Sequence, residues 1–170
     1  NTSHQELLSL YREIGNHPKV KHLFIGSGVR YDLLLQETDD KELKKDHETY
    51  AKELIAHHVS GRLKVAPEHT SSPVLQLMRK PSFELFHQFK SLFDKECARI
   101  EKKQQIIPYF ISSHPGCTEA DMAELALETK QLGFRLEQVQ DFTPTPLTIA
   151  TEMYHAELGP DNKPLYVAKK

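Results

Sequence analysis

The sequence has 170 residues, 38% hydrophobic and 27% charged, a balance typical of one globular domain with a hydrophobic core. Its 22 basic and 24 acidic residues give a net charge of −2, which argues against a general nucleic-acid-binding surface. No apolar run approaches the roughly 20 residues that a membrane-spanning helix needs, and we expect no signal peptide at the start of the chain and no membrane partner.

The N-terminal segment predicts a helix and then a strand. Ser3 and Glu6 have the spacing of a capping box at the start of the helix, and Gly15 ends it. The apolar run His22–Ile25 predicts a short strand, which a glycine-containing loop at 26–30 follows.

The polar residues 36–40 precede a second helix. Its apolar positions have helical spacing and predict its inner face: Leu43, Tyr50 and Leu54. His57 and His58 follow near its end, where a cation suits the helix dipole, so we expect both at the surface.

The segment from Arg62 to Pro67 predicts a buried strand. This strand ends at Pro67, because proline has no N–H to continue a ladder. Glu68 and His69 are then left at the carboxyl tip of this strand. Ser72 and Pro73 begin a helix directly afterwards. A strand that delivers an acid and an imidazole to its tip is a typical way in which α/β enzymes build sites.

Ser82 caps a longer helix whose apolar residues recur at helical spacing: Phe86, Phe89, Phe93, Cys97 and Ile100. Such a stripe is ordinarily core. Cys97 and Cys117 are far apart and form no Cys-x-x-Cys pair. They indicate a reducing compartment, so we expect a cytoplasmic protein, and they supply no metal framework.

The last third predicts two more strands, Ile106–Ile111 and Leu136–Phe142, each followed by a helix. Thr118 caps the first of these helices, with an acid three residues later. The second is short and runs from about 147 to 155. A polar tail completes the chain.

The chain therefore reads as a helix followed by four strand–helix units. Parallel neighbours need crossover connections, so this alternation predicts an α/β fold with parallel strands. Four units cannot close a barrel of about eight strands, so we expect a partial, half TIM-like barrel. Residues 1–156 form this core, and 157–170 form a polar C-terminal extension.

Each predicted strand ends in an unusual loop, and the carboxyl ends of parallel strands share one rim. Four such loops on one rim predict a ligand site. They span residues 26–30, 67–69, 113–116 and 143–146.

Three segments together resemble the later part of a radical SAM (S-adenosylmethionine) core, most closely that of the YgiQ-like group. Leu63–Lys80 has a strand, an acid at its tip, small residues and a helix ending in Leu-Met-Arg-Lys. Phe110–Glu119 is similar to the fifth strand and its Gly-x-Pro-Gly-Glu-Thr loop. Val139–Met153 is similar to the sixth strand and its Pro-x-Pro-Gly-Thr loop. The resemblance covers essentially the whole chain, as strands three to six of six.

The resemblance implies a role for each rim residue. Glu68 occupies the position of a polar side chain near the ribose or amino group of SAM, and Lys80 that of a cation facing its methionine carboxylate. Ile111 would lie against the adenine. The loop that ends at Pro144 would offer backbone groups to the same adenine ring. Arg30 is a second rim cation that could meet SAM or the substrate. The candidate cofactor-binding residues are Glu68, Lys80, Arg30, Ser113, Ile111 and Pro144.

The sequence departs from the family in two places. Cys117 stands where an acid is expected, which puts any contact of that acid in doubt. The Cys-x-x-x-Cys-x-x-Cys motif that holds a 4Fe–4S cluster through thiolates is absent. The resemblance implies that those ligands lie upstream, in a larger bacterial enzyme that cleaves SAM reductively to a 5′-deoxyadenosyl radical. This chain would form one wall of the SAM pocket and would be inactive alone, with no catalytic residue assigned and the substrate left open.

Two other function classes stay open. A metal-dependent barrel hydrolase would use His69, His114 and Glu68, with Asp141 as a further ligand, since imidazoles and carboxylates suit zinc. A non-catalytic α/β binding module is the other alternative. In each case the strand at His22–Ile25 would present an unpaired edge, which predicts self-association at high concentration.

Overall fold

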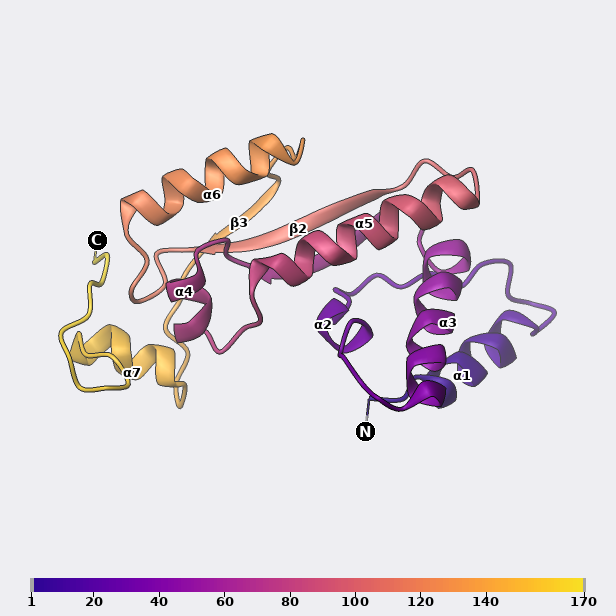
Figure 1. The fold of residues 1–170 in the computed structure, drawn as a ribbon, viewed down its shortest axis with the longest axis horizontal. Helices are drawn as coiled ribbons and strands as arrows, with labels where there is room; N and C mark the ends of the chain where they lie inside the picture. The colour runs from indigo at the N-terminus through magenta and orange to yellow at the C-terminus, as the bar shows by residue number, and fades with distance from the viewer. Residues whose placement is uncertain (1, 170) are drawn as a thin grey trace. The chain divides into compact units, whose positions relative to one another are not determined.

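The computed structural model describes residues 2–169, and within that range it contains seven helices and a three-stranded parallel sheet (Figure 1). The helices are α1 Gln5–Gly15, α2 Tyr31–Leu34, α3 Lys41–His57, α4 Ser72–Leu77, α5 Phe83–Arg99, α6 Glu119–Gln131 and α7 Ile149–Ala156. The strands are β1 Arg62–Glu68, β2 Gln105–Ser112 and β3 Gln138–Asp141. None of these helices is both long and apolar enough to span a membrane.

Side-chain caps set the starts of three helices. The Asp40 carboxylate accepts from two backbone N–H groups in the first turn of α3. Thr118 and Asp121 form a complete capping box at α6, and Thr148 accepts from the backbone of Thr151 in α7. Each cap satisfies backbone donors that a helix start leaves unpaired. The predicted cap at Thr118 is confirmed.

The sheet has the order β1-β2-β3. In the parallel pair of β2 and β3, Tyr109 lies opposite Gln138 and Ser112 lies opposite Asp141. β1 is an outer strand, where a proline such as Pro67 is tolerated, although the central strand β2 also contains a proline, Pro108. The α/β class and the parallel direction are therefore confirmed, with three strands in place of the expected four.

The predicted strand at His22–Ile25 is wrong, because these residues form no strand. Phe24 is 48% exposed, and the Ile25 N–H donates to the His58 carbonyl at 2.9 Å. Within the described residues 2–169, the segment 20–30 takes part in one parallel bridge, between Val29 and Val65. A short apolar run gains little from extended geometry unless neighbouring strands cover it. The half-barrel of four strand–helix units is therefore not established.

The chain divides into two compact units. Unit 1 contains residues 1–65 and 85–106, and unit 2 contains residues 66–84 and 107–170. In unit 1, α3 contacts both α1 and α2, and the predicted stripe of α5 is core, with Phe86, Phe89 and Phe93 at most 1% exposed.

The two histidines at the end of α3 differ in burial. His57 is exposed, as predicted. The expectation of a surface position is wrong for His58, which is 7% exposed and whose Nδ1 lies 2.9 Å from the Leu23 carbonyl. A carbonyl accepts the imidazole N–H there, so the ring is held inside unit 1.

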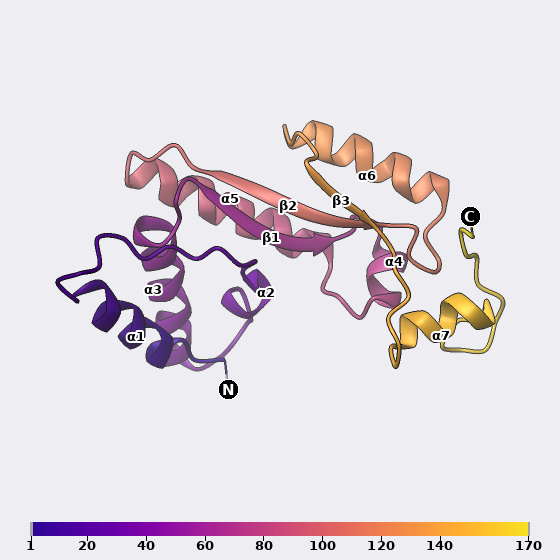
Figure 2. The same cartoon turned by 180° about the vertical axis from the view of Figure 1, so that it is seen from behind.

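Unit 2 carries the carboxyl ends of β2 and β3 beside α4, and α7 lies next to α4 in both views (Figure 2). The tail folds back onto this unit. The Gly116 N–H donates to the Tyr166 carbonyl at 2.8 Å, and the Leu165 N–H donates to the Glu157 carbonyl at 2.8 Å. The predicted short helix after β3 is confirmed, although it begins at Ile149 and leaves Leu147 fully exposed.

Candidate functional site in unit 2

β1 ends in a strained turn. The His69 N–H donates to the Pro67 carbonyl at 2.9 Å, and Glu68 between them has φ +69°. This is the geometry of a γ-turn whose central residue has a positive φ, a conformation that is rare for residues other than glycine. Ser113, directly after β2, has φ +60°. Strain of this kind concentrates at functional sites, so the ends of two parallel strands become candidates for one.

A cavity of about 650 Å³ opens at these strand ends, entirely within unit 2. Its wall is formed by Glu68, residues 77–80 at the end of α4, Ile111, His114 and most of residues 140–150. A volume of this size lies in the range of small-molecule and cofactor sites. The cavity therefore gathers three segments that are far apart in the sequence.

Glu68 and Lys80 form an ion pair in this wall. The Lys80 ammonium donates to the Glu68 carboxylate at 3.0 Å. The carboxylate side chain is 13% exposed and the lysine side chain is 38% exposed. The Lys80 backbone N–H donates to the Leu75 carbonyl, so the end of α4 fixes the lysine's position. The wall thus offers an anion and a cation in contact with each other, and Arg79 and Asp141 line it as well.

The loop after β3 is held by threonine hydroxyls. The Phe142 N–H donates to the Ser112 carbonyl at 2.8 Å and so extends the ladder beyond β3. The hydroxyls of Thr148 and Thr151 both donate to the Thr145 carbonyl, at 2.8 and 2.7 Å. These bonds order a loop that would otherwise be free to move, and they place Phe142 and Thr145 in the cavity wall.

The sequence-predicted site residues divide into two groups. Glu68, Lys80 and Ile111 line the cavity, whereas Ser113 and Pro144 are neighbours of lining residues but do not line it themselves. Arg30 belongs to unit 1, where its guanidinium donates to the Asp32 carboxylate at 2.6 and 2.8 Å. The fold therefore brings three of the six predicted residues together.

His114 is a cavity residue without a predicted role beside SAM. It is 4% exposed, its Nδ1 lies 2.8 Å from the Pro115 carbonyl, and its ring meets Phe142 edge-on. Because a carbonyl only accepts, Nδ1 carries the proton and Nε2 keeps its lone pair. Burial lowers the pKa of His114, against the Pro115 hydrogen bond and the charge of Glu68. The ring is neutral at pH 7.

Behind the cavity wall lies a buried network around His69. The Ser71 N–H donates to His69 Nδ1 at 3.0 Å, and His69 Nε2 lies 3.4 Å from the Cys117 sulfur. The Ser71 hydroxyl donates to Asp121 at 2.6 Å, which ties α4 to the capping box of α6. His69 is fully buried. The sequence placed it beside Glu68, but the turn sends the two side chains to different surroundings.

The metal set expected for a hydrolase is not assembled. Among residues 2–169, no group that includes His69 or His114 brings three ligand atoms within 4.8 Å of one another. Both ring nitrogens of His69 already have neighbours in the network around Ser71 and Cys117. The structure therefore does not support the hydrolase centre.

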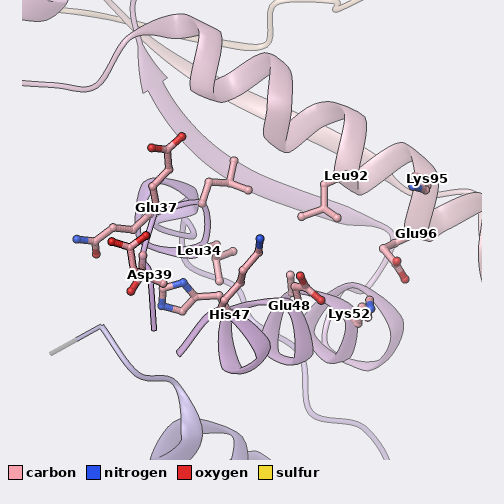
Figure 3. A pocket seen from close by; sticks show the side chains of 14 residues that line it. Leu34, Glu37, Asp39, His47, Glu48, Lys52, Leu92, Lys95 and Glu96 are labelled. Atoms are coloured by element: carbon pink, nitrogen blue, oxygen red, sulfur yellow. The ribbon is translucent and has the colours of Figure 1, made fainter. Parts of the chain in front are cut away.

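Unit 1 contains a larger hollow of about 900 Å³ (Figure 3). Residues of α3 and α5 and the segment 34–39 line it. Its polar lining mixes lysines with acids, among them Lys52 and Glu48 on α3 and Lys95 and Glu96 on α5. None of the predicted site residues lines it. Because none of the predicted site residues contacts this hollow, the unit 2 cavity is the stronger candidate.

Neither a protein-family model nor a solved structure matches the chain. Its sequence is similar to proteins named UPF0313. It is 58% identical over 171 residues to the one from Porphyromonas gingivalis, covering 100% of this chain and 27% of the relative. The identity is 50% over 152 residues to the one from Geobacter sulfurreducens, covering 89% and 24%. It is 44% over 170 residues to the one from Methanosarcina mazei, covering 99% and 26%.

The chain thus spans about a quarter of the length of these UPF0313 relatives, which come from bacteria and an archaeon. The match to the Porphyromonas relative extends over the whole chain and so includes both units. The name UPF0313 states no ligand and no reaction. The function is therefore argued from the unit 2 cavity.

Proposed function

We propose that unit 2 forms one wall of a SAM-binding pocket in a radical SAM enzyme of the YgiQ-like type. The enzyme is longer than this chain, as the UPF0313 relatives are. Its remaining strands would extend the three-stranded sheet toward the partial barrel that the resemblance implies. The substrate of the enzyme is not assigned by any residue of this chain.

One observation carries the proposal. The three segments that resemble a radical SAM core each contribute to the same cavity: Glu68 and Lys80 from the first, Ile111 from the second and Phe142 from the third. Nothing in their sequence spacing requires this, because α5 separates the first two segments and α6 separates the second from the third. A shared cavity is what a shared ligand requires.

The cavity suits SAM chemically. The amino-acid end of SAM carries an ammonium and a carboxylate, and the Glu68–Lys80 pair offers the complementary anion and cation. Glu68 also suits ribose hydroxyls, because a carboxylate accepts hydrogen bonds. Ile111 and Phe142 supply apolar surface for the adenine ring. The lysine gives charge without the two-point grip of an arginine.

The residues of this chain do not fit a 4Fe–4S cluster. Such a cluster needs three thiolates from a Cys-x-x-x-Cys-x-x-Cys motif, and the chain has two cysteines. Cys97 is buried in unit 1, and Cys117 is buried in unit 2 against His69. No step is therefore assigned to a cluster within this chain.

SAM bound in the longer enzyme would supply the radical chemistry once it accepts an electron from a reduced cluster held outside this chain, and this chain would hold and orient it. Glu68 and Lys80 would bind the polar end of SAM, and the apolar wall would exclude water from the adenine. The threonine-braced loop would hold the apolar wall at a fixed distance from the ion pair. Because Glu68 lies in the strained turn, its carboxylate is held at the end of β1 and does not continue the extended geometry of the strand.

Calorimetric titration of the 170-residue chain with SAM tests this wall. We expect weak binding, and we expect Glu68→Gln and Lys80→Met each to weaken it about fivefold, the effect of about 1 kcal/mol per partly exposed charged contact. The chain offers a matched control. Glu157 also has a left-handed φ, +55°, and pairs with Lys169, again twelve residues later. Glu157→Gln and Lys169→Met should leave SAM binding unchanged.

A second measurement tests the wider proposal in the longer protein that carries this chain. After anaerobic reconstitution with iron and sulfide, SAM and a reductant should yield 5′-deoxyadenosine. The Glu68→Gln protein should yield it only at higher SAM concentrations. A longer protein that binds no SAM, or in which the control pair weakens binding as much as the cavity pair, would refute the assignment.

A further inference from the structure

A second group of chemistry-bearing side chains lies in unit 1, and one of its members, His47, also lines the hollow of Figure 3. His4 directly precedes α1, and Asp46 and His47 lie on α3. The three offer ligand atoms that all lie within 4.8 Å of one another. Asp46 is 6% exposed and His47 is 4% exposed. The fold thus brings two imidazoles and a carboxylate together across more than forty residues of sequence.

Each of the two histidines has a ring nitrogen whose lone pair a metal ion could use. His4 Nδ1 is buried and has no hydrogen-bond partner. His47 Nε2 lies 3.1 Å from the Thr2 carbonyl, and because a carbonyl only accepts, this nitrogen carries the proton and Nδ1 keeps its lone pair. Metal-binding histidines typically donate their second N–H to a backbone carbonyl in this way.

The carboxylate is oriented as well. The His4 backbone N–H donates to Asp46 Oδ2 at 2.6 Å, which holds the acid beside the His4 ring. His4 also stacks on Tyr50, with ring centroids 4.2 Å apart. The stacking on Tyr50 explains where the His4 ring lies, but it gives His4 Nδ1 no hydrogen-bond partner. A buried nitrogen left in this state costs about 1–3 kcal/mol unless a ligand satisfies it.

We propose that His4, Asp46 and His47 bind a divalent transition metal ion, with zinc as the preferred ion. Two imidazoles and one carboxylate are a known zinc ligand set, and three protein ligands leave the fourth position open to water or a further ligand. In a tetrahedral zinc site with bonds of about 2.1 Å, the ligand atoms lie about 3.4 Å apart. The three ligand atoms lie within 4.8 Å of one another, so each pair would need to approach by at most about 1.4 Å.

The metal site and the SAM pocket are independent proposals. All three metal ligands belong to unit 1, and every residue of the proposed SAM cavity belongs to unit 2. The metal site also differs from the hydrolase centre considered from the sequence, since it uses neither His69 nor His114. Failure of one proposal would leave the other standing.

The test uses the full 170-residue chain without a histidine tag, stripped with a chelator and titrated with Zn²⁺ against a chromophoric competitor. We expect one zinc per chain with a dissociation constant at or below the micromolar range. Asp46→Asn, which keeps the size of the side chain, and His47→Ala should each weaken this site at least about 100-fold, more than the loss of a supporting contact. His57→Ala is the matched control, because His57 is an exposed histidine on the same helix.

Thermal unfolding gives a second readout that does not depend on activity. Saturating Zn²⁺ should raise the Tm of the unsubstituted chain and of His57→Ala, because a ligand that binds the folded state stabilises it. It should not raise the Tm of Asp46→Asn. The site is refuted if zinc binds without one-to-one stoichiometry, or if Asp46→Asn binds zinc as tightly as the control. Since Asp46→Asn is isosteric, its folded fraction can be verified by circular dichroism before the titration.

Discussion

At the scale of single residues, Cys117 has a definite structural role. Its sulfur lies 3.4 Å from His69 Nε2 and 3.8 Å from the Thr118 carbonyl, and it is 2% exposed. Burial raises the pKa of Cys117, partly offset by a backbone hydrogen bond from Ser113, with Asp121 adding to the rise. A protonated, enclosed thiol is a poor nucleophile. The cysteine that replaces the expected acid therefore packs against His69 rather than reaching the cavity.

The buried histidines of unit 2 predict that stability falls in mild acid. Burial lowers the pKa of His69, with His114 adding to the shift and Asp121 opposing it, and burial also lowers the pKa of His114. The unfolded chain binds protons on these rings near pH 6.5, whereas the folded chain does not. Their stabilising contribution is therefore fully present above about pH 6.5 and is lost as the pH falls toward the folded-state values.

Urea unfolding between pH 7.5 and 5 measures this effect. Inside the window, each ring should contribute a slope of about 1.4 kcal/mol per pH unit to the free energy of unfolding. His69→Gln should reduce the slope, whereas His17→Gln, at an exposed histidine, should leave it unchanged. Equal slopes in all three proteins would show that His69 is not the titrating group.

At the scale of elements, the C-terminal tail and α4 meet at Gly116. This residue has φ +86°, and a Cβ placed there would lie 2.3 Å from the Leu77 side chain and 3.3 Å from that of Leu165. Leu77 also lines the cavity. A glycine at this position lets the loop after β2 approach both elements closely.

Gly116→Ala should therefore lower the free energy of unfolding by about 2–4 kcal/mol, which combines the left-handed φ with overpacking. Gly133 separates the two causes, since its φ is +73° and a Cβ there would meet nothing within 4 Å. Gly133→Ala should cost only about 1 kcal/mol. Denaturant unfolding of the two variants measures the difference, and equal losses would mean that contact with Leu77 is unimportant.

The sheet edges bear on self-association. The edge expected at His22–Ile25 does not exist, because those residues form no strand. β3 is an outer strand of the observed sheet, and Val139 within it is 43% exposed. Exposed outer strands are templates for pairing with a second chain. The expectation of self-association at high concentration therefore stays a prediction, now argued from β3.

At the scale of the whole molecule, the two units predict separate ligand responses. The zinc ligands lie in unit 1, and the proposed SAM wall lies in unit 2. Ligand binding raises the free energy of local opening where the ligand is held. Hydrogen exchange should therefore slow around residues 4–57 with Zn²⁺ and around 66–84 and 107–150 with SAM.

Mass-spectrometric hydrogen exchange with each ligand alone measures this separation. Asp46→Asn should abolish the response to Zn²⁺ and keep the response to SAM, whereas Lys80→Met should keep the response to Zn²⁺ and shift the response to SAM to about fivefold higher SAM concentrations. Slower exchange in both units with a single ligand would contradict independent sites.

Local sequence determined most helices and the three observed strands. The predicted cap at Thr118 acts through the backbone N–H of Asp121 three residues away, so its spacing alone predicted where α6 begins. The capping box predicted at Ser3 is not formed, because the N-cap of α1 is His4 and makes no side-chain cap hydrogen bond. The stripe Phe86, Phe89 and Phe93 likewise identifies the core face of α5, because helical periodicity and burial coincide there. The resemblance of whole segments selected Glu68, Lys80 and Ile111, which the fold brings to one cavity wall, and their contact with SAM stays a prediction.

Tertiary structure alone decided the features that depend on distant partners. Whether His22–Ile25 becomes a strand depends on neighbours that cover it, and whether His58 is buried depends on the Leu23 carbonyl. The Glu68–Lys80 pair and the meeting of His4 with α3 require the chain to fold back on itself. A sequence pattern records local backbone preference and periodicity, whereas burial, ion pairing and ligand geometry arise only when segments far apart in the chain occupy the same volume.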